Sequence, residues 1–348
     1  MPTTMKYRLL GRSGLRVSEY ALGTMTFGEE WGTGASREES RRMFEAFAAR
    51  GGNFIDTANR YTEGTSERIV GDFIAADRDH WVVGTKYTLY DRKGDPNFSG
   101  NHRKNLVRSV KASLERLGTD WIDLLWLHMW DGTTPVDEVL RGLDDLVRAG
   151  TVHYVGISDT PAWVVAQANT MADLRGWTPF VALQLRYSLI DRAAERDLLP
   201  MARAFNLAVT PWSVLGAGVL SGKYNEGNAT GRAAARVAKV ERNLAVAEAV
   251  RGVAAAMGAT PAQVALAWAR QQPGVVIPLL GARNAAQLED NLGAIDVRLD
   301  DAHRAALDAA SAIELGFPHD FLGLASTREL IFGGVELERE RGAGSGER

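Results

Sequence analysis

The chain has 348 residues, of which 45% are hydrophobic, and this favours one large core over several small domains. A formal net charge of -3 argues against a nucleic-acid partner, and no stretch approaches the roughly 20 apolar residues of a membrane span. Because cysteine is absent, disulfides, thiolate catalysis and zinc–cysteine sites are excluded, and we expect no metal site. The polar start MPTTMKYRLL is unlike a signal peptide, so a cytoplasmic protein is expected.

Short apolar runs alternate with longer amphipathic segments, which is the pattern of βα units built around a parallel sheet. The strand candidates are residues 20–22, 53–56, 81–85, 124–128, 152–157, 181–185, 208–212 and 275–280. Eight such runs predict an α/β fold of the (β/α)8 TIM barrel type with long rim loops. We expect residues 1–335 to form this single domain, and the charged, glycine-rich residues 336–348 to form a disordered tail.

The helix candidates are residues 37–49, 66–76, 103–117, 135–149, 162–170, 193–205 and 261–271. Three of them are expected to begin with a proline that follows a capping threonine: Thr134 and Pro135, Thr160 and Pro161, and Thr260 and Pro261. Glycines stand at positions typical of helix ends, namely Gly51, Gly118 and Gly150. Before the first barrel strand, YRLLGRSGLRV predicts an N-terminal β-hairpin that closes the barrel floor.

Four side chains able to bind or transfer protons occur where predicted strands end. Asp56 closes the second strand and Tyr61 follows five positions later, Lys86 ends the third strand, and His128 ends the fourth. Because catalytic groups of such a barrel come from the C-terminal ends of the strands, these four are expected to converge. Each has an ordinary structural explanation by itself, such as an ion pair or a core histidine, but their joint position favours an active site.

The residue types indicate the chemistry. A phenol has an ordinary pKa of about 10 and is a weak acid at neutral pH unless its anion is stabilised. We expect the Lys86 ammonium to lower the pKa of Tyr61, and Asp56 to keep Lys86 charged and in place. His128 would orient a carbonyl or assist the proton relay. A tyrosine acid that works with a separate electron source indicates carbonyl reduction.

Over about residues 5–335 the sequence resembles the aldo-keto reductases, in the bacterial-type branch related to the β-subunits of potassium channels. The resemblance rests on Asp56 and Tyr61 in NFIDTANRY, Lys86 in WVVGTKY and His128 in DLLWLHMW. It implies an NADP-dependent oxidoreductase in which Tyr61 is the general acid, Lys86 and Asp56 tune it, and His128 orients the substrate.

The nucleotide site is not expected in a doubly wound dinucleotide fold, because no G-x-G-x-x-G follows a strand. GAGVLSGKY is not a P-loop either, since Ala217 stands at the first glycine position and Tyr224 at the Ser or Thr position. Its place after the seventh strand still suits backbone amides that bind a pyrophosphate. The resemblance implies NADP(H) at Gly23, Thr24, Met25, Asp56, Ser158, Gln184, Trp212, Ser213, Leu215, Gly218, Lys223, Gly281, Arg283, Gln287 and Asn291.

Two of these positions also make physical sense for the cofactor. Trp212 offers a broad face for the nicotinamide ring, and Arg283 offers a fork suited to a 2′-phosphate, which favours NADPH over NADH. The plain alternatives are core packing for Trp212 and a surface role for Arg283. Two departures from the family weaken this picture. Asp159 stands where many relatives carry Asn and cannot donate to a carboxamide, and no Lys occurs at residues 280–281.

Substrate choice is expected to depend on the loops over the rim. These are residues 27–34, residues 88–105 and the C-terminal segment around Phe317, His319 and Phe321. The substrate-contact candidates are Trp31, Tyr61, His128 and Trp130, with Tyr90 as a further aromatic residue. Such a pocket would take small to mid-sized carbonyls, including aromatic aldehydes, ketones and keto sugars, although the aromatic residues are equally compatible with loop anchoring.

The leading hypothesis is NADPH-dependent reduction of an aldehyde or ketone, with hydride from nicotinamide C4 and the proton from Tyr61. One alternative is a cofactor-binding regulatory module resembling the potassium-channel β-subunits. The barrel pattern begins near residue 7 with no assembly segment before it, which disfavours that alternative. Another is a sugar or alcohol dehydrogenase, since cellular cofactor ratios decide the direction. A homo-oligomer is compatible with all three.

Overall fold

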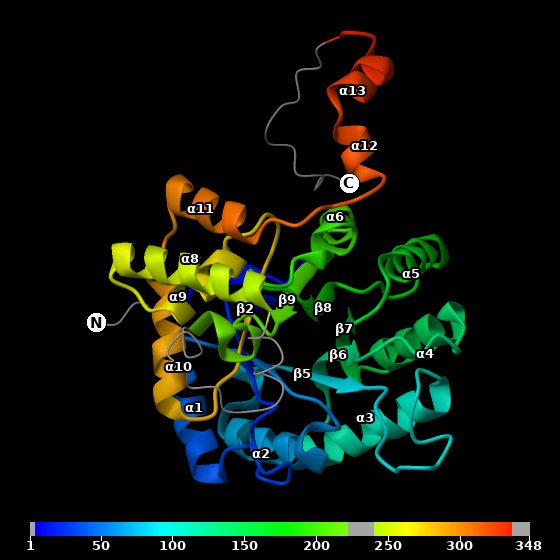
Figure 1. The fold of residues 1–348 in the computed structure, drawn as a ribbon. Helices are drawn as coiled ribbons and strands as arrows, with labels where there is room; N and C mark the ends of the chain where they lie inside the picture. Colours follow the sequence, from blue (N-terminus) through cyan, green and yellow to red (C-terminus); the bar gives the residue numbers. More distant parts are fainter. Residues whose placement is uncertain (1–3, 222–239, 336–348) are drawn as a thin grey trace.

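Eight parallel strands form a barrel surrounded by helices in the computed structural model, which describes residues 4–221 and 240–335 (Figure 1). The strands are β3 (Ala21–Gly23), β4 (Phe54–Asp56), β5 (Val82–Tyr87), β6 (Ile122–Leu127), β7 (Val152–Ser158), β8 (Ala182–Arg186), β9 (Ala208–Trp212) and β10 (Leu279–Leu280). They pair in chain order, and β10 returns to pair with β3. The barrel closes where the Val209 carbonyl accepts from the amide of Ile277 at 2.8 Å. The predicted TIM barrel is therefore confirmed.

The eighth strand is shorter than predicted. Only Leu279–Leu280 is a strand, and Val276 makes a single bridge to Val209. Pro278 lies between these two points and has no N–H to donate to a continuous ladder.

Helices cover the outside of the barrel. They are α1 (Arg37–Ala49), α2 (Thr65–Ile74), α3 (Arg103–Leu117), α4 (Val136–Arg148), α5 (Ala162–Arg175), α6 (Leu198–Ala204), α8 (Glu241–Met257), α9 (Pro261–Arg270), α10 (Ala285–Leu292) and α11 (Asp301–Ser311). Two short helices follow, α12 (His319–Gly323) and α13 (Ala325–Phe332). Short 3-10 segments, including η1 (Tyr61–Gly64) and η4 (Gly216–Ser221), lie in the loops. The predicted tail, residues 336–348, lies outside the described residues.

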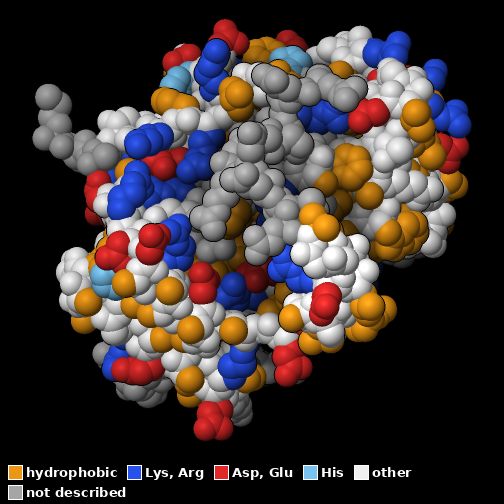
Figure 2. All heavy atoms as spheres, turned by 90° about the horizontal axis from the view of Figure 1, so that it is seen from above, with side chains coloured by type: hydrophobic (Ala, Val, Ile, Leu, Met, Phe, Trp, Pro, Cys, Tyr) orange, Lys and Arg blue, Asp and Glu red, His pale blue; other side chains and the backbone are white. Residues whose placement is uncertain are grey.

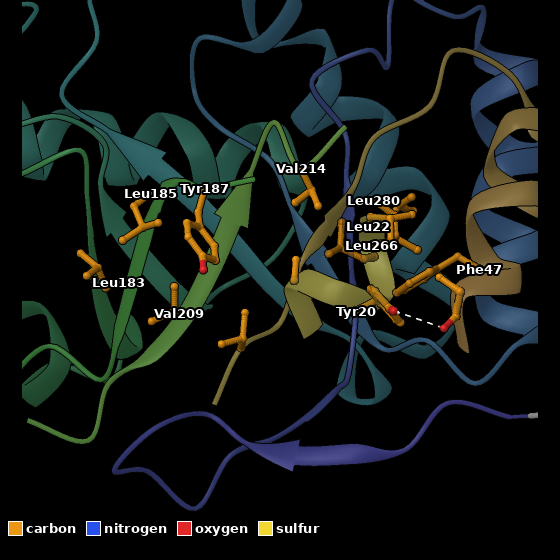
Figure 3. Packing of buried hydrophobic residues seen from close by; sticks show 14 of the residues in the cluster. Tyr20, Leu22, Phe47, Leu183, Leu185, Tyr187, Val209, Val214, Leu266 and Leu280 are labelled. Atoms are coloured by element: carbon orange, nitrogen blue, oxygen red, sulfur yellow. Dashed lines mark hydrogen bonds between the residues drawn. The ribbon is translucent and has the colours of Figure 1, made fainter. Parts of the chain in front are cut away.

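Strand alternation separates two apolar clusters. Side chains on a strand point alternately to opposite faces, so on β5 Val82 packs inside the barrel and Val83 packs against the helices. The outer cluster includes Leu183 and Leu185 of β8 (Figure 3). The same alternation turns Lys86, two positions after an interior glycine, toward the barrel interior.

The interior below the strand ends is filled by the indole of Trp126, which is fully buried. Gly84 and Gly156 on the neighbouring strands make room for it. A Cβ at Gly84 would lie 2.8 Å from Trp126 Nε1, and one at Gly156 would lie 2.4 Å from the indole carbons. This packing gives the strand ends above it a solid support.

The N-terminal hairpin consists of β1 (Tyr7–Leu9) and β2 (Arg16–Ser18) and is antiparallel, as predicted. Leu10 and Val17 belong to the interior cluster. Gly11 has φ +57, and a Cβ there would lie 2.2 Å from the Val181 carbonyl just before β8. The hairpin therefore closes the end of the barrel at which the strands begin.

Two of the three predicted threonine caps are wrong. Pro135 and Pro161 are themselves the N-caps of α4 and α5, with ψ near 140°, and neither makes a side-chain cap bond. The Thr134 hydroxyl donates instead to Asp131 Oδ2 at 2.7 Å, and the Thr160 hydroxyl donates to a carbonyl two residues earlier. Local loop partners compete successfully for these hydroxyls.

The third cap is correct, because Thr260 and Gln263 form a capping box at the start of α9. The glycine signals also hold: Gly118 caps α3 in the left-handed conformation, and Gly51 and Gly150 have positive φ just after α1 and α4. The predicted helix over residues 193–205 is interrupted, however, and α6 begins only at Leu198. Pro200 explains the break, since its ring would clash with a helical carbonyl four residues earlier.

Candidate active site

Lys86 and Asp56 form a buried ion pair at the C-terminal end of the barrel. Their side chains are 0% and 1% exposed, and Lys86 Nζ lies 2.5 Å from Asp56 Oδ2. Lys86 Nζ also donates to the Thr57 carbonyl at 2.8 Å, and Gln184 Nε2 donates to Asp56 Oδ1 at 2.9 Å. Burial lowers the pKa of Lys86, but Asp56 and Tyr61 raise it further, so the net pKa lies above the ordinary lysine value. The ammonium is therefore charged at neutral pH.

Tyr61 lies against this pair, with Lys86 Nζ 4.8 Å from the centre of its ring. Burial raises the pKa of the phenol, the Lys86 charge lowers it in part, and the net pKa lies above the ordinary tyrosine value. The expected contribution of Lys86 is present, but the expected net lowering of the pKa is wrong, because removal from water is the larger effect. Tyr61 consequently holds its proton at neutral pH.

The loop that carries Tyr61 is held in an unusual backbone conformation. Thr62 and Glu63 have φ values of 45° and 57°, in the left-handed region that non-glycine residues rarely adopt. The Thr62 hydroxyl donates to the Phe27 carbonyl at 2.6 Å and accepts from the amide of Ser66 at 3.0 Å. These buried bonds stabilise the turn that directs Tyr61 toward Lys86.

His128 completes the group from the end of β6. Its ring centre lies 6.0 Å from that of Tyr61, at 83° between the planes. Burial, with the Lys86 charge as a second cause, holds the pKa of His128 well below its ordinary range. Within the described ranges its Nδ1 has no hydrogen-bond partner. A neutral imidazole with a free polar atom beside the phenol is suited to a hydrogen bond with a substrate oxygen.

The predicted nicotinamide side of the site lies on β7, β8 and β9. Ser158 is 1% exposed, and its hydroxyl has no partner among the residues described, so it is available to a ligand. The Gln184 side chain already donates to Asp56. Asp159 accepts from Trp212 Nε1 at 3.2 Å and has a left-handed φ of 41°. Burial raises the pKa of Asp159, and the Trp212 hydrogen bond, Lys86 and Arg186 lower it only in part.

The other predicted cofactor residues fall into three places. Gly23, Thr24 and Met25 follow or end β3, and Thr24 is occupied structurally because its hydroxyl donates to the Asp56 carbonyl at 3.0 Å. Ser213, Leu215 and Gly218 lie between β9 and the end of η4, where Ser213 and Gly218 have positive φ. The remaining described members are Gly281, Arg283, Gln287 and Asn291, which lie between β10 and the end of α10, whereas Lys223 lies outside the described residues.

The start of α10 is the predicted adenosine end. Arg283 is exposed, and its amide donates to Gln287 Oε1 at 3.0 Å. The first helical amide, of Ala285, donates to Glu39 Oε1 of α1 at 2.5 Å. A carboxylate therefore already lies at this helix start, and Arg283 is an exposed cation directly before the N-cap residue Asn284.

Aromatic side chains lie on the rim near Tyr61, at the place we call the mouth of the site. Trp31 lies 6.4 Å from Tyr61 between ring centres and donates through Nε1 to Glu63 Oε1 at 3.2 Å. Trp130 is partly buried and packs against the outer core, which supports an anchoring role for it. Arg60 was not predicted from the sequence, and its guanidinium stacks over Tyr90 at 4.6 Å beside the Tyr61 loop. Its position directly before Tyr61 in the sequence could have drawn attention to it.

The C-terminal segment was expected to lie over the rim and influence substrate choice, but α12 and α13 lie away from the barrel (Figure 1). Phe317 and Phe321 are 84% and 52% exposed, and their ring centres lie 6.3 Å apart. Neither belongs to the apolar clusters of the barrel.

These groups define a class of chemistry. A protonated phenol lies beside a buried ammonium and a neutral imidazole, an arrangement that can give a proton to a carbonyl oxygen and take it back. In the described ranges no cluster of three His, Cys, Asp or Glu side chains could hold a metal ion. Across the same ranges no helix is long and apolar enough to cross a membrane.

Residues 20–312 match the sequence profile of the aldo/keto reductase family. The chain is 40% identical to norsolorinic acid reductase of Aspergillus flavus, over 92% of this chain and 85% of that protein. It is 38% identical to the aldo-keto reductase ausK of Aspergillus calidoustus, again over 92% of this chain and 85% of that protein. It is 36% identical to aryl-alcohol dehydrogenase [NADP(+)] of Phanerodontia chrysosporium, over 91% of this chain and 89% of that protein.

The fold and these matches together define an oxidoreductase of the barrel class. The chain belongs to the aldo/keto reductase family. Its resemblance to that family is thereby confirmed.

Proposed function

We propose that the protein catalyses NADPH-dependent reduction of an aromatic aldehyde or ketone to the alcohol. The buried Lys86–Asp56 pair beside protonated Tyr61 and neutral His128 is the observation that carries this proposal. The aromatic substrate class is supported by Trp31 at the mouth and by relatives named for norsolorinic acid and aryl alcohols.

The residues present fit a nicotinamide nucleotide. The Ser158 hydroxyl, which has no partner among the described residues, can form a hydrogen bond with it. The Trp212 ring offers a stacking face, and the exposed Arg283 offers a partner for a phosphate. Bound NADPH would supply the hydride from C4 of its nicotinamide. His128 would hold the substrate oxygen, and Tyr61 would release its proton to that oxygen. Lys86 would stabilise the resulting phenolate, and Asp56 would keep Lys86 in place.

The direct test is oxidation of NADPH, followed at 340 nm, with a panel of benzaldehydes, aryl ketones and keto sugars. Turnover with the aryl carbonyls and little with the sugars supports the proposal. Tight NADPH binding without turnover on any carbonyl would instead favour the regulatory module, and turnover confined to keto sugars would overturn the aromatic class.

Replacement of Arg283 with Ala should raise the Kd for NADPH by about 10-fold to 100-fold, because it removes a charge-assisted contact worth about 1.5–3 kcal/mol. The Kd for NADH should change little. Fluorescence titration with both nucleotides measures the two constants. Arg304→Ala, on the outer helix α11, is the matched control. Equal weakening of both nucleotides would show that Arg283 does not read the 2′-phosphate.

A second candidate function is alcohol oxidation, and Asp159 is the observation that favours it. Its carboxylate is held by Trp212, the proposed nicotinamide-stacking residue, and a negative charge there favours the oxidised, positively charged ring. Asp159→Asn should therefore raise the Kd for NADP+ relative to NADPH by about tenfold, equivalent to 1.4 kcal/mol. Titration with both forms gives this ratio directly. An unchanged ratio, with Asp320→Asn as the remote control, would remove the argument for oxidation.

A further inference from the structure

The end of the described chain leaves the barrel as an extended segment, residues 313–335, which we call the C-terminal arm. The family match ends at residue 312, directly before the arm. Arg196 anchors its base by donating to the carbonyls of Glu314 and Leu315 at 2.9 and 3.2 Å. Beyond that point α12 and α13 project away from the body of the molecule above α6 (Figure 1).

The arm exposes an apolar surface. Its large exposed hydrophobic residues are Phe317 (84%), Phe321 (52%), Leu322 (49%), Leu324 (51%), Leu330 (85%), Ile331 (55%) and Val335 (62%). None of them belongs to the two apolar clusters of the barrel. Within residues 4–221 and 240–335, no hydrogen bond, ion pair or ring contact joins residues 317–335 to the barrel. A helix as short as α13 is marginally stable alone, so a partner surface would stabilise it.

Two large hydrophobic side chains are also exposed on the outer side of α5. The inner face of this helix packs on the barrel through residues such as Val164, Val165 and Ala172. Its outer side carries Trp163 and Leu174, which are 67% and 82% exposed. The outer side also exposes polar residues, namely Gln167, Thr170, Asp173 and Arg175, so the two hydrophobic side chains stand out individually on an otherwise polar helix surface.

The outer side of α5 also has a shallow, open depression. A groove there is lined by Ala166, Gln167, Thr170, Met171, Leu174 and Arg175. The space-filling view shows exposed hydrophobic side chains on its right-hand side, which is the side where Figure 1 draws α4 and α5 (Figure 2).

We propose that the arm of one copy packs into the α5 groove of a second copy, and that the exchange is reciprocal. The arm rises beside α6, the neighbour of α5, so donor and acceptor surfaces lie close together on one side of the barrel (Figure 1). A two-fold axis can then satisfy both surfaces at once and close the assembly as a dimer.

The area of the arm supports a second copy as the partner. A standard interface removes about 800 Å² of surface from each partner. Phe317 and Phe321 are still 84% and 52% exposed, so each can bury that fraction of the about 150–250 Å² of an aromatic side chain. With the five exposed aliphatic side chains, the arm supplies an area of that order. A patch of this size, rich in apolar groups, marks an interaction site on a soluble protein.

Sedimentation velocity of the full chain with single substitutions tests the proposal. The wild type should sediment as a dimer. Leu330→Asp on the arm and Leu174→Asp in the groove should each raise the dimer Kd by at least about 100-fold, since each places charges in a buried apolar contact twice per dimer. Val107→Asp, at an exposed apolar position on α3, should leave the dimer intact. A monomeric wild type overturns the proposal, as does a dimer that is insensitive to Leu174→Asp.

Disulfide trapping gives a second test, which detects the contact itself. The chain has no cysteine of its own, so only the introduced cysteines can form a disulfide. A mixture of Leu330→Cys chains with Leu174→Cys chains should form a covalent heterodimer on mild oxidation, seen on a non-reducing gel. A Leu330→Cys, Leu174→Cys double variant that stays monomeric with an internal disulfide would show that the arm covers its own α5. If Leu330→Cys chains crosslink only to one another, the arms contact each other, and the proposal that the arm binds the α5 groove is overturned.

Discussion

Tyr61→Phe should lower kcat for carbonyl reduction by about 10²-fold to 10⁴-fold, the usual contribution of a positioned proton donor. The substitution removes the hydroxyl and keeps the ring, so the contacts with Trp31 and His128 remain. NADPH binding should therefore change little. Stopped-flow reduction of a benzaldehyde and fluorescence titration of NADPH measure the two effects separately.

The controls for Tyr61 use a second tyrosine and the reverse reaction. Tyr7→Phe, on the hairpin at the opposite end of the barrel, should leave kcat unchanged.

In the wild type, alcohol oxidation needs deprotonated Tyr61. Because the pKa of Tyr61 is raised, the rate of oxidation should increase as the pH rises above neutrality. Another group would carry the proton if Tyr61→Phe kept the wild-type kcat, or if its rate of alcohol oxidation rose with pH as it does in the wild type.

Lys86→Met should abolish most activity and also destabilise the fold. Methionine keeps the length of the side chain but removes the ammonium. Among the described residues this leaves the buried Asp56 carboxylate with the Gln184 amide as its remaining side-chain partner. Loss of one member of a buried ion pair typically costs about 3–5 kcal/mol. Unfolding in urea measures the free energy, and the 340 nm assay measures the loss of phenolate stabilisation.

A double substitution separates the two roles of this pair. Asp56→Asn combined with Lys86→Met leaves no uncompensated charge, so it should recover much of the lost stability while activity stays low. Lys111→Met, at an exposed position on α3, should change neither property. Full activity of Lys86→Met, or a double variant as unstable as the single one, would contradict the role assigned to the pair.

The positions of the site residues followed largely from period and spacing. A strand buried on both faces must be apolar, so Asp56, Lys86 and His128 stood out at the ends of such runs, and parallel strands bring those ends to one rim. The hairpin and the helices α1 and α3 were predictable for the same local reasons. The catalytic and cofactor roles of these residues remain predictions, to be tested by the variants above.

Local pattern was insufficient where partners come from distant segments. Thr134 and Thr160 looked like helix caps, but their hydroxyls bond within loops whose shape depends on the whole rim. The pKa of Tyr61 depends on how much water the assembled rim excludes as well as on Lys86, so its net direction could not be read from residue types.

By itself, the sequence determined the barrel, the N-terminal hairpin and the family, because hydrophobic alternation and turn residues act over short distances. Only the tertiary structure decided that Gln184 and Lys86 share Asp56, that Asp159 holds Trp212, and that the C-terminal arm turns away from the rim. Each of these depends on contacts, made or absent, between residues far apart in the chain. Side-chain direction across such distances is set by packing of the whole barrel, which no local pattern contains.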